Sequence, residues 1–564
     1  VQTLGTSPGR ELWEGTSWSP DGRFLALGDG AFAPNKRFRE DFNSIWVVDT
    51  ASPEGTRTPY SVGPHRSIAD LGDSGPVWSP DGHFMAFVME SVLWVIPVGP
   101  DGAPTGPAQQ VTQETADSPS WSGDSQQLLY LHHGALKTVG LDGSGVREHP
   151  VNLKWHNDVA QGRTVIHAGR LWDGTGDEAR ENVDIILDGD RIAAVQPHSD
   201  QAHRGRTVID ASDQTVLPGM FEMHSHPQDV RFYGTKWWLF YLSMGFTSDV
   251  SMGSFLNEAI ADRESLASNE LLGPRLFTPG ELIDGSRVSH PETRAIVSDE
   301  QLELELARQS ALDPDLYKTY VRTAPEHMDR VASQAQAEGV PSFSHILPMV
   351  AALGLDGTSH LGATQRAGWN NVTSPAGRSY QDVVDVYSTG EVDLVGTPFE
   401  ASVLLGQHPE LTQDPRVQRL LPTFDIARVT EGVAQQPTQA QLDQLAGTMD
   451  IYTRILRAGG LLSTGSDAPL TIPAIQNHLA LRAFVLGGMT EAEALRTVTS
   501  NAARTLGVGD DLGTVEAGKL ADLVFVDGDP LADITQLIDV GAVMKGGHYI
   551  TREDLLRAFP EPSA

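Results

Sequence analysis

The run Leu217-Pro-Gly-Met-Phe-Glu-Met-His-Ser-His226 organises the chain, because a short apolar segment ends in two histidines, His224 and His226, one residue apart. On a β-strand, positions two apart point to the same side, so both imidazoles would project into one cavity. Paired neutral imidazoles are typical first ligands of a divalent metal such as zinc. In a chain with 18 histidines such a pair also arises by chance, so its meaning depends on the residues downstream.

Short apolar runs alternate with helical patterns between residues 216 and 507. Seven further candidate strands follow the histidine-bearing run, at residues 246–250, 275–278, 316–321, 341–345, 357–360, 392–395 and 461–467. Eight strand–helix units predict an α/β fold, the (β/α)8 TIM barrel, whose chemistry lies at the carboxyl ends of the strands.

Residue types that bind metals lie in or at the carboxyl ends of these candidate strands. Taken singly, each has a plainer interpretation: a lysine paired with a carboxylate, a hydrogen-bonded histidine, or an aspartate that caps a helix. Together they indicate one site. The candidate metal ligands are His224, His226, Lys318, His345, His360 and Asp467.

Residues 156–215 and 508–564 are rich in strand patterns on either side of the barrel region. Asp188-Gly189 is a hairpin-type turn between two apolar runs of the first flank. We expect a small β-sandwich assembled from both flanks, followed by a C-terminal tail.

Residues 1–155 contain a repeat. Trp18-Ser-Pro-Asp-Gly22 recurs as Trp78-Ser-Pro-Asp-Gly82 and, in altered form, as Trp121-Ser-Gly-Asp-Ser125, each followed by a short apolar run. A Pro-Asp-Gly turn between two strands is typical of an all-β propeller blade. Three blades cannot close a ring, so we expect a partial propeller completed by a missing half or by another copy in a homo-oligomer. Scaffolding or gating of the barrel is its simplest role, and docking of a protein partner is the alternative.

The composition excludes several classes of function. The formal net charge of −34 argues against nucleic acid and against an anionic membrane surface as partners. The absence of cysteine excludes disulfides and thiolate chemistry. No apolar run approaches the roughly 20 residues of a membrane span. The chain begins with Val1 rather than Met, which indicates a processed product or an excised piece of a longer chain. A removed export signal would fit the first case, so we expect a periplasmic or secreted location, with a cytoplasmic one as the alternative.

The barrel and flank motifs resemble the amidohydrolase superfamily, in particular its imidazolonepropionase/prolidase-like branch of metal-dependent hydrolases fused behind TolB-like propeller repeats. The resemblance covers most of residues 163–550. The motifs that carry it are the His224–His226 run, Leu316-Tyr-Lys-Thr-Tyr320, Ser344-His345, Gly357-Thr-Ser-His360, Thr464-Gly-Ser-Asp467, Asn501-Ala-Ala-Arg504 and Gly518-Lys-Leu-Ala-Asp522.

The resemblance implies a site with two divalent metal ions. His224, His226 and Asp467 would bind one ion, His345 and His360 the other, and a carboxylated Lys318 would bridge them. Zinc is the favoured metal, and manganese and iron fit the same ligands. One position departs from the family pattern: Glu222 stands where the family usually has Asp two residues before the first histidine, and a longer carboxylate there can still support the ligands from behind.

The implied reaction is hydrolysis of a carbon–nitrogen bond, with Asp467 as general base and then general acid. Aromatic side chains and an arginine in the loops would suit a dipeptide or an N-acyl amino acid, because guanidinium binds carboxylate. Tyr320, Arg366 and Trp369 are the candidate substrate-binding residues, with Trp237 and Trp238 as further aromatic candidates.

Several alternatives stay open from the residues. A dipeptidase of the Xaa-Pro type, an amidase and a lactonase are all compatible with the site, as is a hydrolase of esters or organophosphates. A non-catalytic binding protein, in which the propeller is the working surface, is the alternative from another class.

Overall fold

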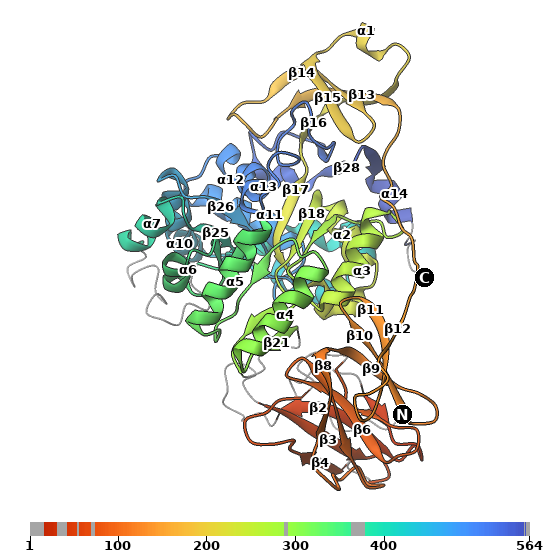
Figure 1. Ribbon diagram of the computed structural model, residues 1–564. Coiled ribbons are helices and arrows are strands. Elements are labelled where there is room, and N and C mark those ends of the chain that lie inside the picture. Colours follow the sequence, from red (N-terminus) through yellow and green to blue (C-terminus); the bar gives the residue numbers. More distant parts are fainter. Residues whose placement is uncertain are drawn as a thin grey trace.

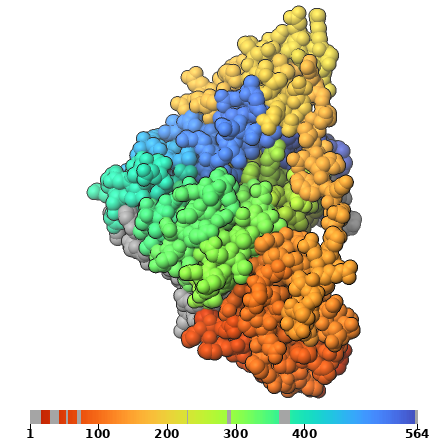
Figure 2. Space-filling view, viewed as in Figure 1, coloured from red at the N-terminus to blue at the C-terminus, as the bar shows by residue number. Residues whose placement is uncertain are grey.

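The computed structural model describes residues 16–30, 42–52, 56–68, 74–286, 292–361, 378–557 and 559. Figure 1 shows three regions: strands of the N-terminal part at the bottom, a mixed helix and strand region in the middle, and a sheet at the top. Figure 2 shows that the N-terminal part packs directly against the middle region. Among the described residues, no helix has both the length and the apolar character to cross a membrane.

The N-terminal region consists of three successive four-stranded antiparallel sheets. The first holds β1 (Ser17–Trp18), β2 (Phe24–Gly30), β3 (Asn43–Asp49) and β4 (Thr56–Tyr60). The second holds β5 (Val77–Trp78), β6 (Phe84–Met89), β7 (Val92–Pro97) and β8 (Gln109–Thr115). The third holds β9 (Asp117–Trp121), β10 (Gln127–His132), β11 (Ala135–Gly140) and β12 (Arg147–His149).

The repeated motif forms the turn between the first two strands of each sheet. In the first copy Ser19 N donates to Phe24 O at 2.8 Å, and Gly22, with φ of +70°, donates to Ser19 O at 2.8 Å. The first strands of neighbouring sheets also contact each other, since Trp121 Nε1 donates to Val77 O at 2.9 Å. These sheets have the strand number and antiparallel order of propeller blades, and a propeller itself stays a prediction.

Both flanks of the barrel region contribute to one seven-stranded sheet in the order β15-β14-β13-β16-β27-β28-β29. Strand β16 pairs antiparallel with β27, with Val216 opposite Phe525, so segments some 300 residues apart share one ladder. The hydrogen bonds form one continuous sheet where two sheets of a sandwich were expected. Its strands are β13 (Arg163–Leu171), β14 (Arg180–Asp188), β15 (Arg191–Pro197), β16 (Thr207–Pro218), β27 (Leu523–Val526), β28 (Val540–Lys545) and β29 (His548–Thr551).

The middle region is a barrel of parallel strands. Strand β17 pairs with β18 and β18 with β19, and β22 to β26 form a second parallel run. A bridge between Ser225 and Ala468 joins the first strand to the segment after the last, and a bridge between Ile283 and Thr319 spans the other gap. The strands are β17 (Met220–Ser225), β18 (Phe246–Ser251), β19 (Arg275–Phe277), β22 (Tyr317–Lys318), β23 (Ser342–Ser344), β24 (Gly357–Ser359), β25 (Asp393–Gly396) and β26 (Leu462–Thr464).

The helices bury apolar residues that recur at helical spacing in the sequence, and one of them ends at the expected capping residue. Helix α5 (Pro325–Glu338) buries Met328, Val331, Ala332 and Ala335 and ends at Gly339 in the left-handed region. The others between β16 and the C-terminus are α2 (Lys236–Ser243), α3 (Leu256–Ala267), α4 (Asp299–Ala311), α6 (Leu347–Leu353), α7 (Gln381–Ser388), α8 (Pro415–Leu420), α9 (Thr423–Val433), α10 (Gln439–Arg457), α11 (Ile475–Leu486), α12 (Glu491–Thr497), α13 (Ser500–Thr505) and α14 (Arg552–Arg557). Short 3₁₀ segments are η1 (Pro227–Tyr233), η2 (Phe399–Gln407), η3 (Pro409–Gln413) and η4 (Ile534–Ile538), and α1 (Asp200–His203) lies between β15 and β16.

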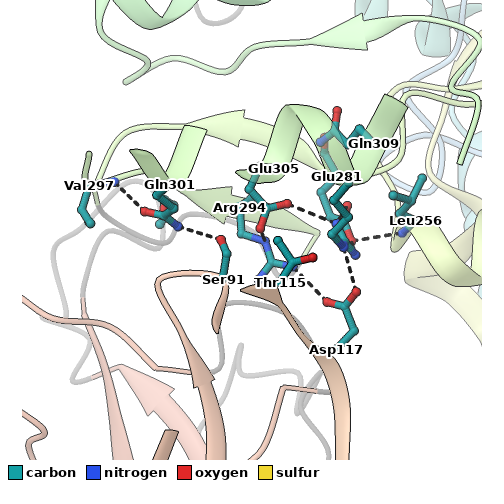
Figure 3. Close-up of polar contacts among 12 residues, drawn as sticks. Ser91, Thr115, Asp117, Leu256, Glu281, Arg294, Val297, Gln301, Glu305 and Gln309 are labelled. Carbon is teal, nitrogen blue, oxygen red and sulfur yellow. Dashed lines mark hydrogen bonds and ion pairs between the residues drawn. The ribbon is translucent and has the colours of Figure 1, made fainter. Parts of the chain in front are cut away.

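A buried ionic network joins the N-terminal sheets to the barrel (Figure 3). Asp117, at the start of β9, accepts from Arg308 Nε of α4 at 2.7 Å and from Arg294 Nη2 at 3.2 Å. Arg308 also holds Glu281 with two nitrogens, at 2.8 and 2.9 Å, and Arg294 pairs with Glu305 at 3.0 Å. Arg294 belongs to β21 (Thr293–Ala295), which pairs with β20 (Leu282–Asp284), both after barrel strand β19. The network therefore fixes the N-terminal sheets against elements that lead away from the carboxyl end of β19.

Candidate metal centre

The barrel brings all six candidate ligands to the carboxyl ends of its strands. His224 is near the end of β17 and His226 directly follows it, while Lys318 is the last residue of β22. His345, His360 and Asp467 follow strands β23, β24 and β26, respectively. This is the edge of a barrel at which catalytic residues collect.

The Asp467 carboxylate lies among three histidines. Its Oδ1 is 3.3 Å from His226 Nε2 and 3.5 Å from His224 Nε2, and its Oδ2 is 3.5 Å from His360 Nε2. The His345 ring lies next to that of His360, with centroids 5.0 Å apart. His224, His226 and Asp467 each offer one ligand atom within a span of 4.8 Å, which is compact enough to hold a metal ion.

The backbone at two of these positions is in the left-handed region, with φ of 64° at His360 and 57° at Asp467. Residues other than glycine adopt this conformation at a cost, and such positions cluster at functional sites. Backbone hydrogen bonds hold the segment after β26 in place: Asp467 N donates to His224 O at 2.7 Å, and His226 N donates to Ala468 O at 2.8 Å. The first and last barrel strands thus fix each other's ligands.

Hydrogen bonds to the Nδ1 atoms orient two of the rings. His226 Nδ1 is 3.0 Å from the carbonyl oxygen of Gly253, and His360 Nδ1 contacts the hydroxyl of Thr397. A carbonyl only accepts, so His226 carries a proton on Nδ1, and in the neutral ring Nε2 then keeps the lone pair that a metal ion would take. Such partners on the far side of the ring are typical of histidines that bind metals.

Two of the histidines, His224 and His360, are held in the neutral form that a metal ion requires. Burial, with a smaller contribution from Lys318, lowers the pKa of His360 to about 4 despite the opposing effect of Asp467. Burial also places the pKa of His224 well below its ordinary value. His224 Nε2 faces the Asp467 carboxylate at 3.5 Å, which is the place of a ligand nitrogen beside a carboxylate ligand. The donor set therefore fits a divalent metal.

Lys318 is buried at the centre of the same edge, and its amine contacts the hydroxyl of Ser359. Burial lowers the pKa of Lys318 to about 7, although Asp467 opposes the shift. A substantial fraction of the amine is therefore neutral near neutral pH, which is the form that reacts with carbon dioxide.

Glu222 lies behind the ligands and holds two barrel strands together. Its Oε1 accepts from His224 N at 2.9 Å and from Ser466 N at 2.8 Å. Its Oε2 accepts from the hydroxyls of Ser466 at 2.6 Å and Tyr241 at 3.1 Å, and from Asn477 Nδ2 at 3.1 Å. Burial nevertheless raises the pKa of Glu222 to about 7. The longer carboxylate supports β17 and the Asp467 segment from behind the site.

Of the candidate substrate residues, Tyr320 lies beside the ligands: its ring meets that of His345 edge-on, with centroids 4.6 Å apart. Arg366 and Trp369 lie outside the described residues. Trp237 and Trp238, expected in a loop, belong to helix α2 and are buried in the main core. Trp237 Nε1 donates to Asp249 at 3.3 Å. The two tryptophans are therefore part of the packed core, and they do not form the aromatic wall of a substrate loop.

Phe399 is a site neighbour that the sequence did not reveal. Its ring stacks near His360, with centroids 5.7 Å apart, and it also lines a cavity of about 640 Å³ together with Arg428, Leu470 and Ile472. The only sequence signal is its place a few residues after strand β25. Ser359 and Thr397 were also not predicted as site residues, because each contacts a candidate ligand that comes from another strand.

The C-terminal part of the chain matches a family model. Residues 431–550 match the model of the amidohydrolase family. An imidazolonepropionase of Aromatoleum aromaticum is 54% identical over 82 residues, which cover 14% of this chain and 20% of that relative. An imidazolonepropionase of Bacillus velezensis is 21% identical over 394 residues, covering 65% of this chain and 89% of the relative. The stronger match thus spans only about a fifth of its relative's length.

Solved structures show the same fold. A Xaa-Pro dipeptidase with bound methionine superposes with a TM-score of 0.52 at 21% identity, covering 69% of this chain and all of that one. Phenylurea hydrolase B superposes with a TM-score of 0.54 at 17% identity, covering 72% of this chain and 99% of that one. The chain is thus similar to amidohydrolases, a family that generally binds divalent metal ions. The shared fold confirms the predicted TIM barrel, while the TolB-like propeller is not confirmed.

Proposed function

We propose that this amidohydrolase-like chain is a binuclear metal-dependent hydrolase that cleaves the carbon–nitrogen bond of a small amide, such as a dipeptide or an N-acyl amino acid. The observation that carries the proposal is the Asp467 carboxylate within 3.3–3.5 Å of three histidine Nε2 atoms, beside a buried lysine at the same barrel edge.

Each proposed ligand has a defined place in this arrangement. His224, His226 and Asp467 would hold one ion, His345 and His360 the other, and Lys318, carboxylated on its amine, would contact both. Zinc suits this mixture of imidazole and carboxylate, and manganese or iron could replace it. When bound, the ions would supply an activated water molecule and polarise the substrate carbonyl.

Asp467 is the group that moves protons in this proposal. Burial alone would raise its pKa, but electrostatic interaction with His360 and a hydrogen bond with His226, together with Lys318, bring the pKa below its ordinary value, so the side chain is ionised near neutral pH. A carboxylate can accept the proton of the attacking water and then donate it to the leaving amine. Its left-handed backbone and the hydrogen bond to His224 O keep it at the centre of the ligands.

The surroundings favour a small substrate with an apolar portion. Phe399, Leu470 and Ile472 supply apolar surface to the neighbouring cavity, and Arg428 adds a guanidinium at its wall. Tyr320, at the edge of the His345 ring, would contact the substrate, and we propose Arg366 and Trp369 as further substrate-binding residues. Some similar solved structures are of a Xaa-Pro dipeptidase, which favours a dipeptide among these substrates.

An ester or lactone hydrolase is the second candidate, because the same site would attack either carbonyl. Parallel assays of matched amide and ester substrates, with and without removal of metal by a chelator, separate the two. We expect amide turnover that is lost with metal and restored by zinc or manganese. Turnover of esters alone would favour the second candidate, and no turnover of either class by the metal-loaded chain would favour a non-catalytic binding protein.

Partners and location are further parts of the proposal. We place the protein in the periplasm or outside the cell, without nucleic-acid or membrane partners, and we expect a second copy or a missing half to complete the N-terminal blades. Size-exclusion chromatography with light scattering would show an oligomer if copies complete each other.

A further inference from the structure

A second cluster of metal-type side chains lies far from the barrel site, in the seven-stranded sheet. His167 comes from β13, Asp184 from β14, and His198 and His203 from the segment that contains helix α1. Figure 1 shows α1 at the outer end of this sheet, on the opposite side of the barrel from the N-terminal strands. The catalytic proposal uses none of these residues.

Both imidazoles of the α1 segment aim at one carboxylate oxygen. Asp184 Oδ1 lies 2.9 Å from His198 Nδ1 and 3.2 Å from His203 Nε2. The three atoms lie within 4.8 Å of one another, the same limit that the His224, His226 and Asp467 group meets. Ligands at about 2.0–2.1 Å from a tetrahedral zinc ion lie roughly 3.3 Å apart, so these separations are close to those of a metal site.

The remaining contacts hold the three groups in position. Asp184 Oδ2 accepts from Ser199 N at 2.8 Å, which fixes the plane of the carboxylate. The His167 ring stacks on His198 with centroids 3.8 Å apart, and its Nε2 lies 2.8 Å from Asn182 Oδ1. Such neighbours orient the ligands of a metal centre in the way that outer hydrogen bonds usually do.

The burial of the cluster suits an ion that enters from solvent. The Asp184 side chain is fully buried, whereas those of His198 and His203 are about a fifth exposed, at 21% and 22%. The carboxylate therefore lies at the buried side of the cluster, and the two imidazoles lie at the side that solvent reaches. We propose that Asp184, His198 and His203 bind one divalent transition-metal ion such as zinc, which ties the α1 segment to the sheet independently of the barrel site.

Substitutions that keep the hydrogen bonds but remove ligation test this site. In the double variant His198→Asn and His203→Gln, each amide nitrogen replaces the imidazole nitrogen that faces Asp184 and can still donate to it. A matched control is His327→Gln, because His327 also meets a carboxylate, Asp299 at 2.9 Å, but lies in helix α5 without a second histidine.

The measurement is uptake of zinc by the full chain after removal of metal with a chelator. We expect the unchanged chain and the His327→Gln control to bind about one ion per chain more than the double variant, as one tetrahedral site requires. Cobalt loading should show the same difference as a visible absorption band. Equal uptake by all three proteins would overturn the proposal and leave a cluster held by hydrogen bonds alone.

Two further variants keep the result interpretable. When His224→Ala and His226→Ala are added to each protein, the difference in zinc uptake should persist. Failure of the proposed function, which concerns the barrel metal, is therefore distinguishable from failure of this site. If the double variant does not fold, His203→Gln alone carries the test, because loss of one of three ligands should weaken zinc uptake at this site at least about tenfold. Unchanged affinity in that single variant would also overturn the proposal.

Discussion

The Asp467 carboxylate lies within 3.5 Å of three candidate ligands at the barrel edge, and each contact has a chemical consequence. Three imidazoles and a buried lysine surround it, and although burial opposes ionisation, interactions with His360, His226 and Lys318 keep the pKa of this carboxyl below its ordinary value. A carboxylate in that position is available both as a ligand and as a proton carrier. The proposed function therefore depends most heavily on this one residue.

Replacing Asp467 by Asn should separate these two roles. The amide oxygen can still act as a ligand, but the group no longer accepts a proton, so we expect metal content to be retained and turnover to fall about 10²- to 10⁴-fold. Steady-state kinetics and metal analysis on the same preparation check this. Asp443→Asn, on the exposed face of α10, is the control and should match the unchanged chain. Undiminished turnover in Asp467→Asn would exclude the proton-carrying role.

Asp393, at the start of β25, gives a pH dependence of stability that is independent of the ligands. Burial raises its pKa to about 7, so the folded chain holds this proton more tightly than the unfolded chain does. The free energy of unfolding should therefore fall as pH rises from about 4 to 7. In the metal-free chain, Asp393→Asn should reduce the fall between pH 5 and 7 by about 1–2 kcal/mol.

Urea unfolding of both chains at pH 5, 6 and 7 measures this difference. A slope in Asp393→Asn equal to that of the unchanged chain would show that the carboxyl has an ordinary pKa.

The sequence predicted which residues lie together at the barrel edge but not the partners that contact them. His224 and His226 were evident because a strand periodicity of two aims both at one side, and Lys318, His345, His360 and Asp467 because they lie in or at the carboxyl ends of candidate strands. Ser359, Thr397 and the carbonyl of Gly253 contact ligands through space from other strands. No local pattern predicts such a contact.

Among the elements, the eight barrel strands were predictable because short runs that contain apolar residues alternate with helical patterns along the chain. Their lengths were not: the expected strand at 316–321 is only Tyr317–Lys318, and that at 461–467 is Leu462–Thr464. Parallel pairing stops where the chain turns into the loops that carry the ligands. The pair β20 and β21 was missed, because three-residue strands leave almost no pattern.

Helix α10 shows how local signals specify an element. Thr438 accepts from Gln441 N, and the Gln441 side chain accepts from Thr438 N in return, which forms a capping box. Thr438→Ala should lower the free energy of unfolding by about 1 kcal/mol. Thr448→Ala, in the middle of the same helix, removes no cap and should change it by no more than a few tenths. Chemical denaturation compares the two, and equal effects would contradict the role of the cap.

At the scale of the whole molecule, the buried network around Asp117 makes the N-terminal sheets part of one structure with the barrel (Figure 3). Asp117, Glu281, Arg294, Glu305 and Arg308 are all at most 2% exposed. Nothing in the sequence pairs these charges, because Asp117 and Arg308 lie 191 positions apart. Their burial is consistent with a scaffold for the elements after β19, one of the roles expected for the blades.

Removing Asp117 should leave two guanidinium groups buried with fewer partners. We expect Asp117→Ala to destabilise the chain by about 3–5 kcal/mol, the usual cost of breaking a buried ion pair. Asp124→Ala, in the exposed turn of the third sheet, should cost far less. Denaturation followed by tryptophan fluorescence measures both, and a cost for Asp117→Ala no greater than for Asp124→Ala would show that the network does not hold the regions together.

Metal content shows whether the barrel holds a binuclear centre with Lys318 between its ions. Metal analysis should compare the unchanged chain with Lys318→Ala and with Lys545→Ala, a control lysine that is also buried but donates to Leu266 O at 2.7 Å outside the barrel site. We predict that Lys318→Ala loses most of about two barrel ions per chain, while Lys545→Ala keeps them. All three proteins should also carry His198→Asn and His203→Gln, so that a metal ion bound at the seven-stranded sheet does not add to the measured content. Equal metal content in the three proteins, or a single ion that does not depend on Lys318, would contradict the binuclear centre.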